Sequence, residues 1–525
     1  MNTDLRSQLK ALSSDQRAQL MKRLADKRQA EAFKARTTFP LSDMQRIMWT
    51  AQALAPSSSA YNVGFALRLD TPFHSEAIRS ALQTIVDRHP ALRTVYSTVD
   101  GRVFQTIRPT AKAPFEDIDA TEMSGDELER TMRQLYLRPF DLANGPILRL
   151  SQLRRPDGDA IILIAAHHLA VDLWSIDLLI EDLRIAYAAH LAGETPQFPP
   201  SGKAYCHFVD EQDAMAESAE GQRLWAYWKK QLRGAPPILD VPGDHPRPSL
   251  QRLTGETYSF NFSSALTKRI NQFAQTEKKT VYTVLLAAWQ ILLHKLTGSE
   301  DMVVASPVSS RPQAYTRTVG CMINSIIIRG RPQGALTFRD FADQVQNAVF
   351  GALEHPQFPL GLLTHRLNLP RDLSRPVLAQ VGFSLESPRL HSRGSTALSP
   401  AAHVLPFLAQ QEGQYELYLE MAELEGSLQG ALRYSTDIFK MTSAVNMVRW
   451  FEGLLEDVVN QPQDRIKELG RAVNQHLQTN AERPVPLMPA DEQKRIQLGQ
   501  SEAFRALWKF HRQHSREQRA AAGHR

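Results

Sequence analysis

Apolar positions along the chain follow two periods that alternate with each other. A spacing of three to four residues predicts helices at 41–52, 75–88, 175–192, 264–275 and 281–297. Runs rich in β-branched and aromatic residues predict strands at 92–98, 160–168, 256–262, 302–308 and 325–330, and two alternating runs at 415–424 and 428–435, split near Gly426, predict a hairpin. Helical and strand patterns recur in both halves of the chain, which predicts an α/β (α+β) fold.

The junction between residues 160 and 193 stands out from this pattern. Its strand is a continuous apolar run, typical of a central strand covered on both faces, and it ends in His167 and His168. The helix pattern that follows has Asp172 and Ser175 as candidate N-caps and stops at Gly193. Because neighbouring side chains on an extended backbone point in opposite directions, only one of the two imidazoles can face a given cavity.

The most apolar long segment, residues 281–298, predicts a helix buried on all sides. It contains Gln290, His294 and Lys295 and is shorter than the roughly 20 residues needed to cross a bilayer, so we expect no membrane span. The N-terminus lacks the unbroken apolar core of a signal peptide, and we therefore expect a cytoplasmic protein.

The length and composition predict a folded chain of two lobes. At 525 residues the chain exceeds the size of one hydrophobic core, and 42% hydrophobic with 22% charged residues is ordinary globular composition. We expect a helical linker or docking segment at 1–38, an N-terminal lobe at 39–215, a C-terminal lobe at 216–475 and a linker-like tail at 476–525.

Charge and cysteine content exclude several functions. The 61 Lys and Arg against 56 Asp and Glu give +5, but the charges are interspersed and no nucleic-acid-binding pattern accompanies them, so we expect no nucleic acid partner. Cys206 and Cys321 are the only cysteines and lie far apart, which excludes a disulfide framework and a thiolate zinc cluster and fits a reducing compartment.

The histidine pair suggests proton-transfer chemistry. An imidazole with an ordinary pKa of about 6.5 can accept and return a proton near neutral pH. Two other interpretations remain open from the residues alone: core histidines bonded to backbone carbonyls, and a metal site. The sequence contains no HExxH, GxSxG, P-loop or GxGxxG motif, which favours base catalysis without a covalent nucleophile or a metal.

The segment HHLAVDLWS resembles the HHxxxDG signature of the condensation domains of nonribosomal peptide synthetases, in the chloramphenicol-acetyltransferase-like superfamily. Further motifs that are similar to this family follow one order along residues 40–470: LSDMQRIMW at 41–49, DRHPALRTVY at 87–96, AYCHFVD at 204–210, TVGCMINSIIIR at 318–329, HPQFPLGLL at 355–363 and RDLSRPVLAQVGFSLE at 371–386.

The resemblance implies a V-shaped pair of related lobes with a tunnel between them. Phosphopantetheine arms of two partner carrier proteins would enter this tunnel, and the chain would hold no cofactor of its own. His168 would be catalytic, either removing the proton of the acceptor or holding it in place. His167 and Asp172 would support the site, with Arg311 as the ion-pair partner of the aspartate. The expected tunnel residues are Leu173, Trp174, Ser175 and Asn324.

Several positions depart from the family pattern. Leu173 replaces the usual glycine, which favours an acyl or polyketide donor. The run CMIN at 321–324 replaces the commoner GxFVN and keeps only Asn324. Both histidines are intact, which argues against the inactive recruitment relatives, and the absence of an aspartate in the first histidine position disfavours the cyclising subtype.

Three functions follow from these observations. The first is a condensing enzyme of natural-product biosynthesis that joins a carrier-bound acyl thioester to an amine or a hydroxyl. The second is a catalytically silent scaffold that recruits tailoring enzymes, and the third is a small-molecule acyltransferase that uses coenzyme A. Amide and ester products, and free and carrier-bound acceptors, all remain compatible with the sequence. The segment from Arg483 resembles a linker to an adenylation domain, and we expect a stand-alone, monomeric condensation protein.

Overall fold

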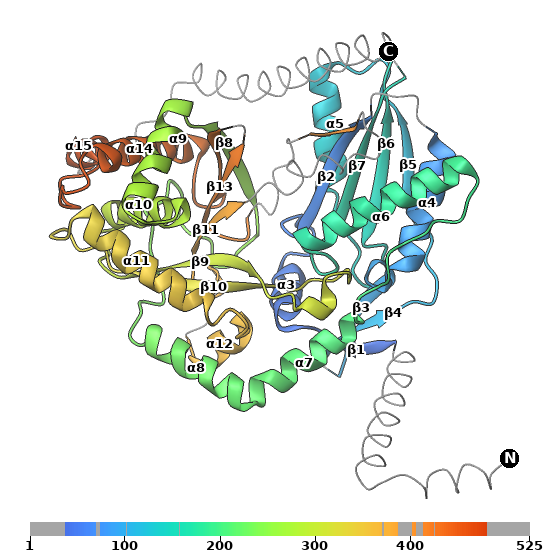
Figure 1. Ribbon diagram of the computed structural model, residues 1–525, viewed down its shortest axis with the longest axis horizontal. Helices are drawn as coiled ribbons and strands as arrows, with labels where there is room; N and C mark the ends of the chain where they lie inside the picture. The colour runs from blue at the N-terminus through green and yellow to red at the C-terminus, as the bar shows by residue number, and fades with distance from the viewer. Residues whose placement is uncertain are drawn as a thin grey trace, which may run out of the picture.

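The structure is a computed structural model of the 525-residue chain. It describes residues 37–69, 74–100, 102–156, 158–369, 372–386, 402–405, 413–424 and 426–479. Two lobes lie side by side, each built around one β-sheet (Figure 1). The expectations for residues 1–36 and 480–525, including the linker-like segment from Arg483, lie outside the described residues.

The N-terminal lobe is built on a five-stranded sheet with a buried strand at its centre. Strand β7 is buried along its whole length, as the continuous apolar run predicts, and pairs antiparallel with β2 and β6. Gly64 in β2 allows the close approach to β7, because a Cβ at this position would lie 2.2 Å from the carbonyl oxygen of Ile164. The strand order is β12 (Ala402–Leu405), β2 (Asn62–Leu69), β7 (Ala160–His167), β6 (Leu148–Arg154) and β5 (Phe115–Asp119).

Helices and a small second sheet complete this lobe. The second sheet contains a hairpin that turns at Asp100, whose φ of 50° is the left-handed conformation that such a turn needs. Its strand order is β1 (Thr38–Pro40), β4 (Arg102–Ile107) and β3 (Thr94–Val99), with the short 3₁₀ helix η1 (Pro90–Arg93) before β3. The helices are α3 (Asp43–Leu54), α4 (Ser75–Arg88), α5 (Gly125–Leu137) and α6 (Leu173–Ala192).

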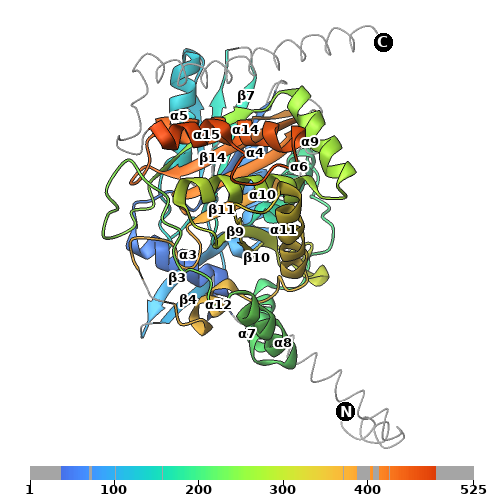
Figure 2. The same ribbon diagram turned by 90° about the vertical axis from the view of Figure 1, so that its left-hand side faces the viewer.

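The C-terminal lobe has a six-stranded mixed sheet. The hairpin predicted around Gly426 is present, and Gly426 has a φ of 74°. The strand order is β10 (Ile323–Gly330), β9 (Met302–Ser309), β11 (Val381–Glu386), β13 (Leu417–Leu424), β14 (Ser427–Ser435) and β8 (Gly255–Asn261). A layer of helices lies in front of this sheet in Figure 2: α9 (Ser264–Thr276), α10 (Val281–Thr297), α11 (Phe338–Leu353), α14 (Met441–Asn460) and α15 (Arg471–Thr479).

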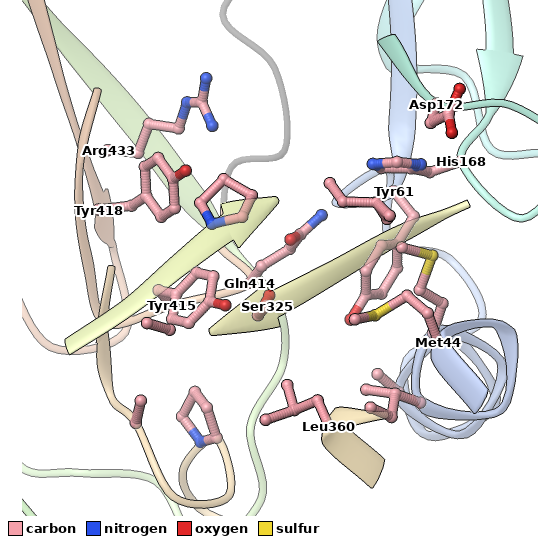
Figure 3. Close-up of a pocket in the computed structure, with 18 of the residues that line it drawn as sticks. Met44, Tyr61, His168, Asp172, Ser325, Leu360, Gln414, Tyr415, Tyr418 and Arg433 are labelled. Atoms are coloured by element: carbon pink, nitrogen blue, oxygen red, sulfur yellow. The ribbon is translucent and has the colours of Figure 1, made fainter. Parts of the chain in front are cut away.

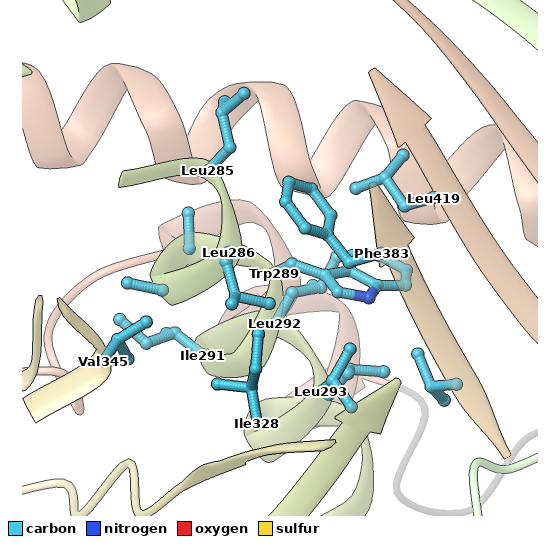
Figure 4. Close-up of a cluster of buried hydrophobic side chains, with 14 of the residues drawn as sticks. Leu285, Leu286, Trp289, Ile291, Leu292, Leu293, Ile328, Val345, Phe383 and Leu419 are labelled. Carbon is cyan, nitrogen blue, oxygen red and sulfur yellow. The ribbon is translucent and has the colours of Figure 1, made fainter. Parts of the chain in front are cut away.

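Helix α10 is the centre of the C-terminal core, as its apolar sequence predicts. Every residue from Thr283 to Leu293 is buried. Trp289 packs among Phe383 of β11 and Leu419 of β13, while other faces of the same helix contact α9, α11 and α14 (Figure 4). The helix begins at the cap Thr280 and ends at Gly298, which has a φ of 69°. None of the helices among the described residues is long and apolar enough to cross a membrane.

Two segments from the second half of the chain pack on the N-terminal lobe. Strand β12, from the second half of the chain, pairs with β2 in the N-terminal sheet. The loop at 310–322, which connects β9 and β10 of the C-terminal sheet and holds the short 3₁₀ helix η2 (Gln313–Tyr315), packs on the N-terminal core through Val319 and Cys321. The N-terminal lobe therefore receives support from chain that the linear boundaries assign to the C-terminal lobe.

Two of the expected boundaries fall inside helices. Residue 215 lies within α7 (Tyr205–Glu217), which with α8 (Ala219–Gln231) runs beneath the two lobes in Figure 1. Residue 476 lies within α15, where the ring of His476 packs 4.6 Å from that of Trp450. The remaining helix of the described chain, α12 (Leu360–Arg366), contacts α3 across the two lobes.

Candidate active site

A cavity of about 1970 Å³ lies between the two lobes. Its N-terminal wall includes α3, the start of β2 and residues 168, 172–174, 176 and 177. Its C-terminal wall includes strands β8, β9, β10, β13 and β14 together with α12. Figure 3 shows His168 on one side of the cavity and Tyr415, Tyr418 and Arg433 on the other.

His168 lies at this cavity and is buried to 4% exposure. Its backbone N–H donates to the carbonyl of Tyr61 at 2.8 Å, which holds it against β2. Ring atom Nδ1 lies 2.7 Å from the carbonyl oxygen of Val171, and because a carbonyl only accepts, Nδ1 carries the hydrogen. In the neutral ring Nε2 is then the atom with the lone pair.

Burial keeps this imidazole neutral. Desolvation lowers the pKa of His168 below its ordinary 6.5, and it outweighs the opposing effects of the Val171 carbonyl and the Asp172 carboxylate. A neutral ring with a fixed tautomer can accept a proton or a hydrogen bond at neutral pH through Nε2.

His167 points to the other side of the strand, as the alternation predicts. Its Nδ1 accepts the backbone N–H of Leu169 at 3.2 Å, and its Nε2 lies 3.5 Å from the side-chain oxygen of Gln52. Burial, with the neighbouring His168, lowers its pKa to about 3. His167 is absent from the cavity wall and packs in the N-terminal core near Tyr61 and Phe140.

Asp172 caps helix α6 and joins the two lobes. Of the two N-cap candidates the sequence offers, Asp172 takes the position: its Oδ1 accepts the backbone N–H of Ser175 at 2.8 Å. The other oxygen, Oδ2, accepts the backbone N–H of Met322 at 2.9 Å. The carboxylate is thus bonded to both α6 and the loop at 310–322.

Arg311 forms the ion pair that we expected with Asp172. Its Nη2 lies 2.8 Å from Oδ1 and 2.9 Å from Oδ2 of the aspartate. Its Nη1 donates to the backbone carbonyls of Tyr315 and Thr318, which fold the loop around the guanidinium. Because the arginine side chain is 1% exposed, this pair is removed from solvent.

Leu173 and Trp174, two of the residues that we expected in the tunnel, line the cavity. Leu173 is 51% exposed, and it is the residue that stands where the resemblance has glycine. The Trp174 indole N–H donates to the carbonyl of Thr316 at 2.9 Å and so fixes the first turn of α6 to the loop at 310–322.

Ser175 and Asn324, which we expected in the tunnel, are not among the residues that line the cavity. Ser175 is fully buried, its hydroxyl lying 2.7 Å from Asp172 Oδ1 and accepting the N–H of Gly320 at 3.0 Å. Asn324 points away from the cavity because side chains alternate along β10, where Ile323 and Ser325 face it. The Asn324 amide instead bonds to the segment before α12, through Pro356 and Phe358, and to Leu360, the first residue of that helix.

Several cavity residues were not found from the sequence. Tyr61 reaches the site because β2 pairs with β7 so that Asn62 lies opposite His167. Tyr415, Tyr418 and Arg433 come from the far lobe, where Tyr418 lies directly opposite Arg433 in the β13–β14 pair. No linear spacing connects these residues to the histidines, so only the packing of the lobes identifies them.

A second contact between the lobes lies at another part of the cavity wall. Asp43 at the start of α3 accepts the backbone N–H of Gly361 in α12 at 2.6 Å. Burial raises the pKa of Asp43, although the Gly361 N–H and Arg46 oppose that effect. The described residues contain no group of three or more His, Cys, Asp or Glu side chains arranged to hold a metal ion.

The two open sheets, the cavity between them and the buried histidine at its wall define a two-lobed α/β domain of the chloramphenicol-acetyltransferase-like superfamily. The chain belongs to the condensation domain family, whose model matches residues 35–477. Condensation domains form amide bonds in peptide synthetases, and they work with phosphopantetheine arms borne by carrier proteins.

Curated relatives are long synthetases of which the chain spans a small part. It is 31% identical over 436 residues to tyrocidine synthase 3 of Brevibacillus parabrevis, covering 82% of this chain and 6% of the relative. It is 29% identical over 440 residues to polyketide synthase PksN of Bacillus subtilis, covering 83% of this chain and 8% of the relative.

Solved structures share the fold. A four-domain nonribosomal peptide synthetase bound to AMP and glycine matches with a TM-score of 0.75 at 27% identity, covering 83% of this chain and 34% of that chain. The X-domain from teicoplanin biosynthesis matches with a TM-score of 0.75 at 22% identity, covering 82% of this chain and 97% of that chain.

Proposed function

We propose that this domain transfers an acyl or peptidyl group from a carrier-bound phosphopantetheine thioester to an amine or hydroxyl acceptor at His168. The observation that carries the proposal is the state of this residue. It is a buried, neutral imidazole at the cavity between the lobes, and its Nδ1–H donates to the carbonyl oxygen of Val171. A phosphopantetheine arm is long and narrow, and a cavity of about 1970 Å³ has room for two such chains to meet.

The reaction needs one proton shuttle and no covalent enzyme intermediate. The acceptor nitrogen or oxygen attacks the thioester carbonyl carbon, and its proton passes to Nε2 of His168. The C–S bond then breaks as the tetrahedral intermediate collapses. The proton on Nε2 passes to the leaving thiolate, so the ring returns to its neutral state.

The type of acceptor decides how much of the rate this base supplies. An amine has a pKa of only about 8 and a thioester is already activated, so alignment of the two can account for much of amide formation. A hydroxyl is a far weaker nucleophile and depends more on proton removal by His168. Asp172 and Arg311 hold the histidine loop in either case.

Intact mass spectrometry of carrier proteins tests the proposal. An acyl group is loaded on the phosphopantetheine arm of a carrier protein, and the same acyl group is offered in parallel as its coenzyme A thioester. Amine and hydroxyl acceptors are supplied free and on a second carrier. Loss of acyl mass from the donor carrier with matching gain on one acceptor supports condensation. Transfer from coenzyme A alone would assign a small-molecule acyltransferase, and carrier binding without any transfer would assign a silent scaffold.

A further inference from the structure

A second arginine of the loop at 310–322 binds helix α6 away from the histidines. Nη1 of Arg317 lies 2.8 Å from Oε2 of Glu181, and its Nη2 lies 3.4 Å from Oδ1 of Asp182. Asp182 follows Asp172 by ten residues, about 15 Å along a helix at roughly 1.5 Å per residue. One loop of the C-terminal lobe therefore contacts α6 at its N-cap through Arg311 and near its middle through Arg317.

Two residues of the N-terminal lobe fix the position of the Asp182 side chain. Its Oδ2 lies 2.8 Å from Nε of Arg88 and 2.9 Å from Nε2 of His89, both at the end of α4. Burial favours the protonated acid, but the hydrogen bonds from His89 and Arg88 prevail and lower the pKa of Asp182. Arg317 thus meets a fixed carboxylate whose other oxygen is already bound.

The loop between the two arginines is attached along its length. Its Thr316 carbonyl accepts the indole N–H of Trp174 in the first turn of α6. The Thr318 hydroxyl donates to the carbonyl of Lys203 at 2.7 Å, and the N–H of Lys203 donates to the carbonyl of Ala314 at 3.0 Å. The loop is consequently fixed both to the first turn of α6 and to the chain at Lys203.

We propose that Arg317 is a positioning residue for the reaction at His168: with Arg311 it forms a two-point clamp by which the C-terminal lobe fixes α6 against the cavity. The path to the chemistry is short. Arg311 binds Asp172, and Asp172 follows Val171, whose carbonyl holds Nδ1 of His168. Loss of the Arg317 contacts lets α6 shift along its axis, and this shift turns the imidazole of His168 away from the acceptor.

A purely structural role makes a different prediction. An ion pair as exposed as Arg317 with Glu181, at 26% and 40% side-chain exposure, contributes little to stability. Loss of such a pair changes the melting temperature slightly and leaves turnover per folded molecule unchanged. The clamp instead predicts a loss of turnover with little loss of stability.

The test compares Arg317→Met with Arg331→Met in the full chain. Arg331 is a matched control because it lies in the same lobe, is half exposed, and pairs with Asp301 at 3.6 Å, far from α6 in the chain. In the acyl-transfer assay, Arg317→Met should lower kcat by about two- to fivefold, because the loss of a contact can shift the position of α6 only by as much free energy as the contact supplies. Its KM should stay within about twofold, because ground-state binding is untouched. Arg317→Lys should recover part of kcat.

Hydrogen exchange supplies a readout that needs no activity. Arg317→Met should accelerate exchange in peptides covering residues 172–178, where the amides of Ser175 and Ile176 bond to Asp172, and leave peptides of α10 unchanged. An unchanged exchange rate in 172–178, or a kcat equal to that of Arg331→Met, overturns the clamp.

This inference rests on the proposed function only for the kcat comparison, because hydrogen exchange needs no activity. If the unmodified protein transfers no acyl group from any donor, the proposed function fails, and exchange by itself decides whether Arg317 restrains α6. Should Arg317→Met yield too little folded protein, Glu181→Gln removes the charge from the shorter of the two Arg317 contacts while keeping the size of the side chain, and the same two readouts apply.

Discussion

Asp172 and Arg311 form a buried ion pair that joins the two lobes directly behind the candidate base. The arginine Nη2 lies 2.8 and 2.9 Å from the two carboxylate oxygens, although the residues are 139 positions apart in the chain. Ser175 and Met322 donate to the same carboxylate. The loop that carries His168 therefore depends on contacts from both lobes.

Removal of one partner of this pair should destabilise the protein as well as inactivate it. Asp172→Ala leaves a buried guanidinium without its counter-charge, and such a loss costs about 3 to 5 kcal/mol. Chemical denaturation should show a reduced free energy of unfolding. In the double variant Asp172→Leu with Arg311→Met no charge is left buried, so part of that stability should return while activity stays low. A free energy of unfolding equal to that of the unmodified protein would exclude the structural role.

His168→Ala should slow turnover strongly without unfolding the protein. The side chain lies at the cavity and its loss removes Nε2, so we expect transfer to slow by about a hundred- to ten-thousandfold, with the larger effect on hydroxyl acceptors. The measurement is kcat/KM alongside circular dichroism. His365→Ala is the control, since His365 lines another part of the same cavity. Near-normal condensation by His168→Ala would refute both the base and the positioning role.

Leu173→Gly should change the choice of donor more than the choice of acceptor. The Leu173 side chain lines the cavity one residue from Asp172, and its removal opens space for another group. Leu173→Ala separates this effect from any weakening of the α6 start by glycine. Competition among a panel of acyl donors, repeated with a panel of acceptors, measures both preferences. Equal changes in the two panels would contradict the prediction.

His167 should make the protein sensitive to acid. Its pKa is about 3 in the folded state against 6.5 in the unfolded chain, so between these values the unfolded state binds more protons. The contribution of His167 to the free energy of unfolding is therefore fully present above pH 6.5. It decreases as the pH falls toward 3, by up to about 1.4 kcal/mol per pH unit for this one group.

The measurement is the free energy of unfolding at a series of pH values for the unmodified protein and for His167→Asn. The variant keeps a polar group but cannot titrate in this range, so its stability should depend less on pH below 6.5. Equal slopes for the two proteins would show that His167 is not the group responsible. The lowered pKa of His168 likewise predicts that the acid limb of the rate profile lies below pH 6.5.

Local features of the site could be predicted from the sequence because they depend on neighbours in the chain. The continuous apolar run identifies β7 as a central strand, alternation separates His167 from His168, and Asp172 is recognisable as a cap three residues before an amide that needs a partner. The apolar stretch of α10 predicts a helix buried on all sides for the same reason. Hydrophobic periodicity and capping act over a few residues.

The tertiary structure alone decided which side chains meet. Ser175 and Asn324 carry plausible polar groups, yet the packing of α6 against Gly320 and the pleat of β10 turn both away from the cavity. Tyr61 and Arg433 enter the cavity wall, and Arg317 meets Asp182, although no spacing in the sequence connects them. Such contacts depend on how two sheets, two lobes and a loop that passes between them are placed. That placement results from the burial of the whole core and leaves no local pattern in the chain.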